Sequence, residues 1–203
     1  GGFVFSVNPV GPDKGKAIHF CVFSPDRKMT RIIRLRGFVN ARSFAPGRDG
    51  EWLVAHEHGF ARVRFPAEGR DVAAILVKDY PQPAGRNSFD VRPAAHGTGF
   101  WTTTGYGAEL LRVAADGTVV RRIRAEQGGK ANFFYAQLTE RADGNVYVAN
   151  WTGHGAEDSY RGWQVIEFAP SGEVVWRLDS PERFGSISGV LEIEGERMRV
   201  RHE

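Results

Sequence analysis

The sequence predicts an all-β protein that is built by repeating a unit of four antiparallel strands. A short signature, an apolar residue followed by a polar turn, recurs between runs of alternating apolar and polar residues, at Phe23–Arg27, Phe65–Gly69, Val113–Gly117 and Phe168–Gly172. Alternating runs joined by such turns are typical of β-hairpins. No segment of ten or more residues shows the 3.6-residue period of an amphipathic helix, so helices are not expected.

The strands of the unit, named a to d in chain order, follow from these turns. Strand c leads into each turn, and strand d follows it at residues 28–35, 71–77, 118–125 and 173–178. Strand b lies upstream of three turns, and Trp52 precedes Phe65 by the same thirteen residues that separate Phe100 from Val113. Strand a precedes each b strand, at residues 39–50, 88–97 and 132–144.

Repetition of one four-stranded unit favours a β-propeller over a β-sandwich. A single sheet cannot bury both of its faces, whereas sheets stacked radially bury them and leave only short edges. A sandwich of short strands is the alternative, but it does not require a recurring unit. The predicted blades of this single domain, residues 1–203, are 38–78, 88–125, 132–179 and a closing blade made by 1–36 with 186–203. Four blades are expected, and the alternative is part of a larger ring of five to eight.

Composition restricts the class of protein. The net charge is +3, and the arginines alternate along predicted strands, which favours solvated outer faces and predicts no nucleic-acid partner. Cys21 is the only cysteine, so the chain forms no internal disulfide. No stretch of eighteen apolar residues is present, and no membrane insertion is expected. The start of the chain lacks the pattern of a signal peptide, and a periplasmic or secreted location is slightly favoured over a cytoplasmic one, on the assumption that a signal was removed.

The repeats resemble those of a large group of propellers that includes NHL, PQQ-like and bacterial arylsulfotransferase-like proteins. The resemblance rests on the runs LLRVAADGTVVRRI and VIEFAPSGEVVWRL, with ERADGNVYVANW before the latter. In the last copy Pro170 and Ser171 replace the Asp of the turn. The resemblance implies the fold and implies no particular activity, because the group includes both enzymes and binding proteins. It implies no cofactor, and the cofactor stays unknown.

In a propeller the b–c loops and the d–a loops lie on one face, where ligands usually bind. We therefore predict ligand contacts for loop residues that carry aromatic, amide, imidazole or guanidinium groups. They are His56, His58, Arg86, Asn87, Tyr106, Asn132, Asn150, Trp151 and Tyr160. For Asn87 and Asn132, which occupy matching positions in the repeat, the alternative role is turn formation.

His154 is the candidate catalytic residue. It lies between two glycines in HGAEDSYRG, a nine-residue insertion that the other units lack, and Glu157 and Asp158 are near enough in sequence to orient it. A histidine can serve as a general base or a nucleophile. The alternative is that His154 only caps a tight glycine bend. His56, His58 and His154 together suggest a three-histidine metal site, but no metal-binding motif supports it, and no metal ligand is assigned.

Other side chains have two interpretations. Trp151, Tyr160 and Trp163 form either an aromatic platform for a flat ligand or a small core beneath the long loop. Arg42 and Arg92 either make the channel wall cationic, which favours an anion, or pair with carboxylates of a neighbouring blade. Three further tryptophans fall in strand patterns and are predicted to pack between blades, namely Trp52, Trp101 and Trp176.

The predicted function is therefore that of a binding or interaction propeller. Its partner is a small molecule or a protein, bound on the loop face that carries the insertion at residues 151–163. The alternative is a propeller enzyme, a hydrolase, lyase or transferase with a histidine-centred site, either with or without a metal. The repeats are clear and catalytic motifs are absent, so the sequence favours binding and leaves enzymatic activity undecided.

Overall fold

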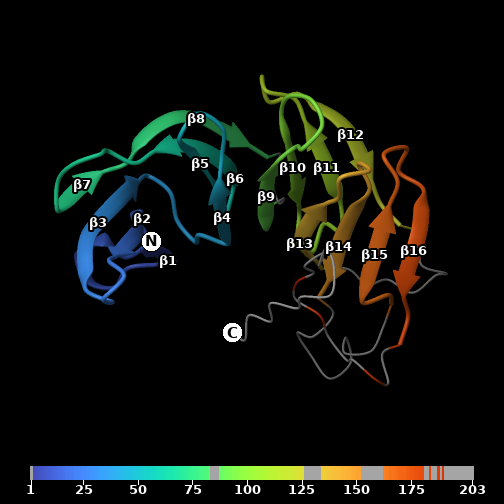
Figure 1. The fold of residues 1–203 in the computed structure, drawn as a ribbon, viewed down its shortest axis with the longest axis horizontal. Coiled ribbons are helices and arrows are strands. Elements are labelled where there is room, and N and C mark those ends of the chain that lie inside the picture. Colours follow the sequence, from blue (N-terminus) through green and yellow to red (C-terminus); the bar gives the residue numbers. More distant parts are fainter. Residues whose placement is uncertain are drawn as a thin grey trace.

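The computed structural model describes residues 2–82, 87–125, 134–151 and 162–180, together with 183, 187 and 189. Within them the chain forms four four-stranded sheets that follow one another in an arc (Figure 1). The all-β propeller architecture predicted from the repeats is confirmed. The one helical element with defined bounds in this part of the chain is a short 3-10 turn, Gly11–Asp13. No described helix has the length and apolar character needed to span a membrane.

Three of the sheets have the strand order that the repeat predicts, with strand a at one edge and strand d at the other. The second sheet contains β4 (Ser43–Pro46), β5 (Glu51–His56), β6 (Gly59–Arg64) and β8 (Ile75–Pro81). The third contains β9 (Asp90–Pro93), β10 (Phe100–Thr103), β11 (Leu110–Val113) and β12 (Val119–Ile123). The fourth contains β13 (Tyr135–Glu140), β14 (Val146–Asn150), β15 (Val165–Phe168) and β16 (Val174–Leu178).

The first sheet is different. It contains β1 (Phe3–Val7), β2 (Ala17–Phe23), β3 (Met29–Arg36) and β7 (Asp71–Ala73), and β7 runs parallel to β3. The single strand predicted at 71–77 is therefore wrong, because the chain changes sheet at Ala74 and continues as β8. β1 to β3 occupy the predicted b, c and d positions, and no described strand pairs with the other edge of β1. The predicted closing segment, 186–203, lies almost entirely outside the described residues.

The c–d turns are tight turns, as predicted, and they repeat the same backbone conformation. Gly117 and Gly172 have φ of +102° and +96°, and each donates its N–H to the carbonyl three residues earlier. In all four sheets the strand register shifts next to this turn, as at Val22/Phe23 and at Glu167/Phe168. The left-handed conformation favours glycine, which explains the Gly in three of the four signatures.

Apolar cores lie between consecutive sheets. Ile18 and Phe20 of the first sheet pack with Val54 and Val63 of the second, and equivalent clusters join the second sheet to the third and the third to the fourth. Trp101 is 5% exposed in the last of these clusters, as predicted for a tryptophan between blades. Trp176 is 48% exposed, so its predicted core position is wrong.

A basic side chain of strand d also fastens each sheet to the next c–d turn. Arg31 donates to the carbonyls of Pro66 and Gly69. Lys78 donates to Asp116, and Arg121 to Pro170. In the strand pairing of the fourth sheet, Trp176 occupies the position that these three basic residues occupy in the other sheets. The series of basic residues therefore ends at the third sheet.

Candidate functional site

A cavity of about 480 Å³ lies at the ends of the strands where the b–c and d–a loops meet. The described residues that line it come from the second, third and fourth sheets and are Ala41, Arg42, Asn87, Phe89, Gly105, Tyr106, Phe134 and Trp151. We call it the loop-face pocket. The propeller topology assigned the b–c and d–a loops to one face. All eight residues lie in these loops or directly beside them. Three of them, Asn87, Tyr106 and Trp151, were predicted as ligand contacts from the sequence.

Phe134 is the centre of the aromatic wall. Its ring lies nearly perpendicular to three others, with centroid distances of 4.6 Å to Phe89, 4.6 Å to Tyr106 and 5.3 Å to Trp151. Phe134 is 7% exposed, whereas Tyr106 is 69% exposed. The pocket therefore has a buried aromatic floor and an exposed aromatic rim, which suits a ligand with a flat apolar part.

Backbone hydrogen bonds hold these rings in place. Gly105 and Tyr135 exchange N–H···O bonds of 3.1 and 3.0 Å, which fix the loop that carries Tyr106 against the fourth sheet. The N–H of Trp151 donates to the carbonyl of Phe134 at 2.8 Å. Gly105 has φ of +58°, and a Cβ at this position would lie 3.3 Å from the ring of Phe134. Glycine is therefore favoured at this position both by the turn and by the ring beside it.

Two polar groups of the pocket have no protein partner within the described part of the chain. They are the guanidinium of Arg42, an exposed residue, and the side-chain amide of the half-buried Asn87. Arg92, the other inner-strand arginine considered above, pairs instead with the buried Asp90 at 3.2 Å. Arg42 therefore lines a cavity, whereas the carboxylate partner of Arg92 belongs to its own strand, β9, and not to a neighbouring blade as considered above.

Asn150 lies behind the pocket and does not line it. Its side chain is fully buried, accepts a hydrogen bond from the N–H of Phe134 at 3.1 Å and donates to the carbonyl of Trp163 at 2.9 Å. In this position it orients Phe134. Sequence reasoning missed Phe134 itself, because NFFYAQLTERADG was interpreted as an inner strand and its first residues as strand rather than loop.

The histidines of the second sheet lie elsewhere. His56 is 3% exposed, and its Nδ1 accepts the N–H of His58 at 3.2 Å while Nε2 lies 3.2 Å from Asp79. Burial lowers the pKa of His56, and the hydrogen bond with Asp79 opposes this. His58 is exposed in the β5–β6 turn, so the two side chains do not share one environment.

The remaining predicted site residues, Arg86, Asn132, His154 and Tyr160, lie outside the described residues. Among the residues that the structure does describe, no group of three His, Cys, Asp or Glu side chains is arranged to hold a metal ion.

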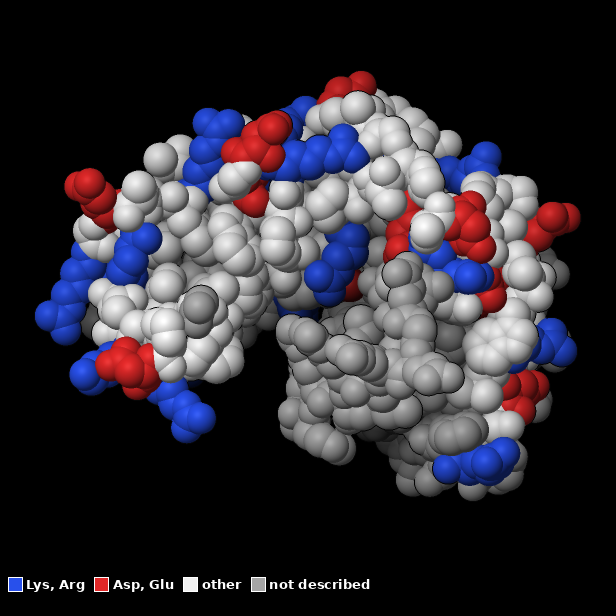
Figure 2. Space-filling view, viewed as in Figure 1, with Lys and Arg blue, Asp and Glu red and all other residues white. Residues whose placement is uncertain are grey.

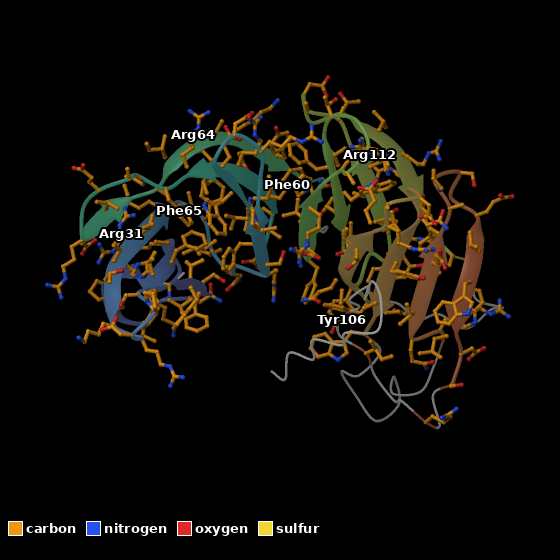
Figure 3. All side chains as sticks on the ribbon, viewed as in Figure 1. Arg31, Phe60, Arg64, Phe65, Tyr106 and Arg112 are labelled. Atoms are coloured by element: carbon orange, nitrogen blue, oxygen red, sulfur yellow. The ribbon has the colours of Figure 1, made fainter. Side chains whose placement is uncertain are left out.

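A second cavity, of about 450 Å³, lies at the opposite ends of the strands, between the third and fourth sheets. Figure 3 shows Arg112, which lines it, and Tyr106 at opposite ends of the third sheet. The guanidinium of Arg112 lies 5.5 Å from the ring of Trp101 and donates to carbonyls that include those of His96 and Thr98. Burial lowers the pKa of Arg112. The guanidinium of Arg112 therefore links backbone carbonyls of the protein, whereas that of Arg42 has no such partner within the described residues.

Charge is otherwise mixed over the surface. Figure 2 shows basic and acidic side chains interspersed along the outside of the arc. Several arginines are paired with buried glutamates, such as Arg62 with Glu51 at 2.7 Å and Arg141 with Glu167 at 2.8 Å. In these pairs the arginine neutralises a buried carboxylate of the sheet.

Comparisons with known proteins agree with this fold. The chain is similar to a protein of unknown function from Bacteroides caccae, with a TM-score of 0.64, 21% identity, and coverage of 88% of this chain and 68% of that one. It is similar to a catalytically inactive virginiamycin B lyase from Staphylococcus aureus, solved with quinupristin (TM-score 0.53, 16% identity, coverage 86% and 59%). A putative 6-phosphogluconolactonase from Bacteroides uniformis has a TM-score of 0.55 at 13% identity, with coverage of 86% and 52%.

These likenesses establish the fold alone. The chain spans only part of each of these proteins, about half to two thirds of their length. No family model matches the sequence. No curated protein matches it either.

Proposed function

We propose that this protein is a binding β-propeller that takes a small molecule in the loop-face pocket. The observation that carries the proposal is the convergence of Arg42, Asn87, Tyr106 and Trp151 on one cavity around Phe134. The volume, about 480 Å³, lies in the range of small-molecule sites. Aromatic walls with a few polar groups are the usual composition of such sites.

The pocket is organised before a ligand arrives, which supports binding. Backbone hydrogen bonds to Tyr135 and Phe134 fix the loops of Tyr106 and Trp151, and Asn150 fixes Phe134. Because these groups are already ordered, binding costs little additional conformational entropy. The same fixed rings would serve a protein partner that inserts one aromatic or aliphatic side chain, and this is the alternative kind of ligand.

A second candidate function is enzymatic. Trp151, which lines the pocket, immediately precedes the segment that carries His154. If His154 reaches a bound ligand, it would act as general base or nucleophile, as the sequence suggested. The similarity to a lyase does not decide between the two functions, because at 16% identity it concerns the fold. The finer resemblance to NHL, PQQ-like or arylsulfotransferase-like repeats is equally compatible with both.

The proposal is tested by ligand-observed NMR with a library of small aromatic acids, amides and amines. The double variant Tyr106→Ala/Trp151→Ala is expected to lose the hits of the unmodified protein. The matched control is Trp176→Ala, which removes an exposed ring from the outer strand β16 and is expected to keep them. Hits that are the same in all three proteins would contradict the proposed pocket.

The enzymatic alternative has its own readout in the same experiment. His154→Ala is expected to leave binding unchanged if the protein only binds. If the unmodified protein converts a hit and His154→Ala binds it without converting it, the function is enzymatic.

A further inference from the structure

We infer that the ligand of the loop-face pocket is a flat ring that carries a single carboxylate. This inference rests on the proposed function and names the chemical class of the ligand. It depends on three features of the pocket, namely the unpaired guanidinium of Arg42, the perpendicular arrangement of its aromatic rings, and the balance of charge in its lining.

Arg42, an exposed residue that lines the pocket, offers its guanidinium to an anion. Within the described part of the chain its guanidinium has no carboxylate or carbonyl partner, whereas Arg62, Arg92 and Arg122 each pair with an acidic side chain. The backbone beside it is fixed, since the N–H of Arg42 donates to the carbonyl of Ala55 at 3.0 Å. A planar guanidinium at the exposed edge of a cavity is suited to bidentate binding of a carboxylate.

The aromatic wall selects a flat group. The rings of Phe89, Tyr106 and Trp151 lie at 83°, 86° and 84° to that of Phe134. Rings arranged in this way present both faces and edges to the cavity, so a flat ligand ring gains stacked and edge-to-face contacts at once. An aliphatic acid would fill the space without these contacts.

The described lining carries one positive charge. Among the eight described residues that line it, Arg42 is the single basic side chain, and none is acidic. A monoanion therefore balances the charge of the described lining, whereas a phosphate dianion or a dicarboxylate would place a second negative charge there with no cationic partner among these residues. The amide of Asn87, also unpaired in the described part of the chain, is available as a second donor.

The test is isothermal titration calorimetry with 2-naphthoate, its neutral isostere 2-naphthamide and the aliphatic cyclohexanecarboxylate. The inference predicts that 2-naphthoate binds at least about 10-fold more tightly than either of the other two. Arg42→Gln is expected to weaken 2-naphthoate by about 10- to 100-fold and to leave 2-naphthamide nearly unchanged. The matched control Arg70→Gln removes an exposed arginine near a c–d turn, on the opposite face, and should change neither.

The outcomes separate the inference from the proposed function. If 2-naphthamide binds as tightly as 2-naphthoate and both depend on Tyr106, the pocket binds ligands but the carboxylate class is wrong. If cyclohexanecarboxylate equals 2-naphthoate, the requirement for a flat ring is wrong. If no aromatic probe binds in a manner that depends on Tyr106, both the inference and the proposed function fail. Urea unfolding of Arg42→Gln confirms that this variant is folded, and Arg42→Lys, which keeps the charge and loses the fork, should bind with intermediate affinity.

Discussion

The ring of Tyr106 packs perpendicular to that of Phe134, with 4.6 Å between the ring centroids. Tyr106 follows β10 of the third sheet, and Phe134 precedes β13 of the fourth. This contact therefore crosses a sheet boundary, and the pocket forms only when the two sheets are docked. Stability of the boundary and binding at the pocket are coupled for this reason.

Gly105 gives the first test of this coupling. Gly105→Ala introduces a methyl group 3.3 Å from the ring of Phe134 in a left-handed backbone conformation. Gly11→Ala is the matched control, since Gly11 has φ of +73° and open space around it. Each variant should lose about 1–2 kcal/mol of unfolding free energy from backbone strain, and Gly105→Ala about 1 kcal/mol more from the ring contact. Equal losses in urea unfolding would show that Phe134 does not crowd this position.

Asp90 supplies a second, fully buried link between the same sheets. Its Oδ2 accepts the N–H of Leu138 at 3.0 Å and lies 3.2 Å from Nε of Arg92. Asp90→Asn removes the charge that both donors face, and we expect a loss of about 1.5–3 kcal/mol of unfolding free energy. Asp26→Asn, in the exposed turn of the first sheet, should leave it nearly unchanged. An Asp90→Asn variant as stable as the unmodified protein would contradict the structural role of this carboxylate.

The repeat explains how much of this could be predicted from the sequence. Turn signatures recur with the sheets, so strand order, the common face of the loops and the positions of Asn87, Tyr106 and Trp151 follow from spacing alone. Phe134 was missed because its neighbours continue an apolar strand pattern. The switch of the chain at Ala74 was missed because 71–77 is one uninterrupted β-like run, and the parallel pairing of β7 with β3 is not encoded locally.

The histidine pair shows a different limit. Residues two apart on a strand share a face, but β5 ends at His56 and the turn to β6 intervenes before His58. One side chain is consequently buried and bonded to Asp79, and the other is exposed. Alternation holds only while the strand continues, and sequence patterns locate strand ends poorly.

His56 makes stability depend on pH. Its pKa in the folded protein is lowered from 6.5, chiefly by burial. Well above pH 6.5 this residue is neutral in both states and contributes no pH dependence. As the pH falls through 6.5 the unfolded chain binds the proton first, so the unfolding free energy decreases, by at most about 1.4 kcal/mol per pH unit. Urea unfolding between pH 7.5 and 5.5 should show a shallower decrease for His56→Gln, and an unchanged slope would contradict this assignment.

Substitution of Arg31 tests whether the hydrogen bonds between one sheet and the c–d turn of the next contribute to stability. Arg31→Met keeps most of the aliphatic stem and removes the donors to Pro66 and Gly69. We expect a loss of about 1–2 kcal/mol of unfolding free energy. Arg36→Met, at the exposed end of β3, is the control and should be nearly neutral. If the two variants unfold alike, the cross-sheet bonds of Arg31 add nothing to stability.

The central claim is that the loop-face pocket binds a flat carboxylate, and a crystal structure of the protein with 2-naphthoate tests it most directly. The account predicts that the carboxylate lies within hydrogen-bonding distance of the Arg42 guanidinium and the ring lies among Tyr106, Phe134 and Trp151. Naphthoate bound at another surface, or in this pocket with its carboxylate directed away from Arg42, would contradict it.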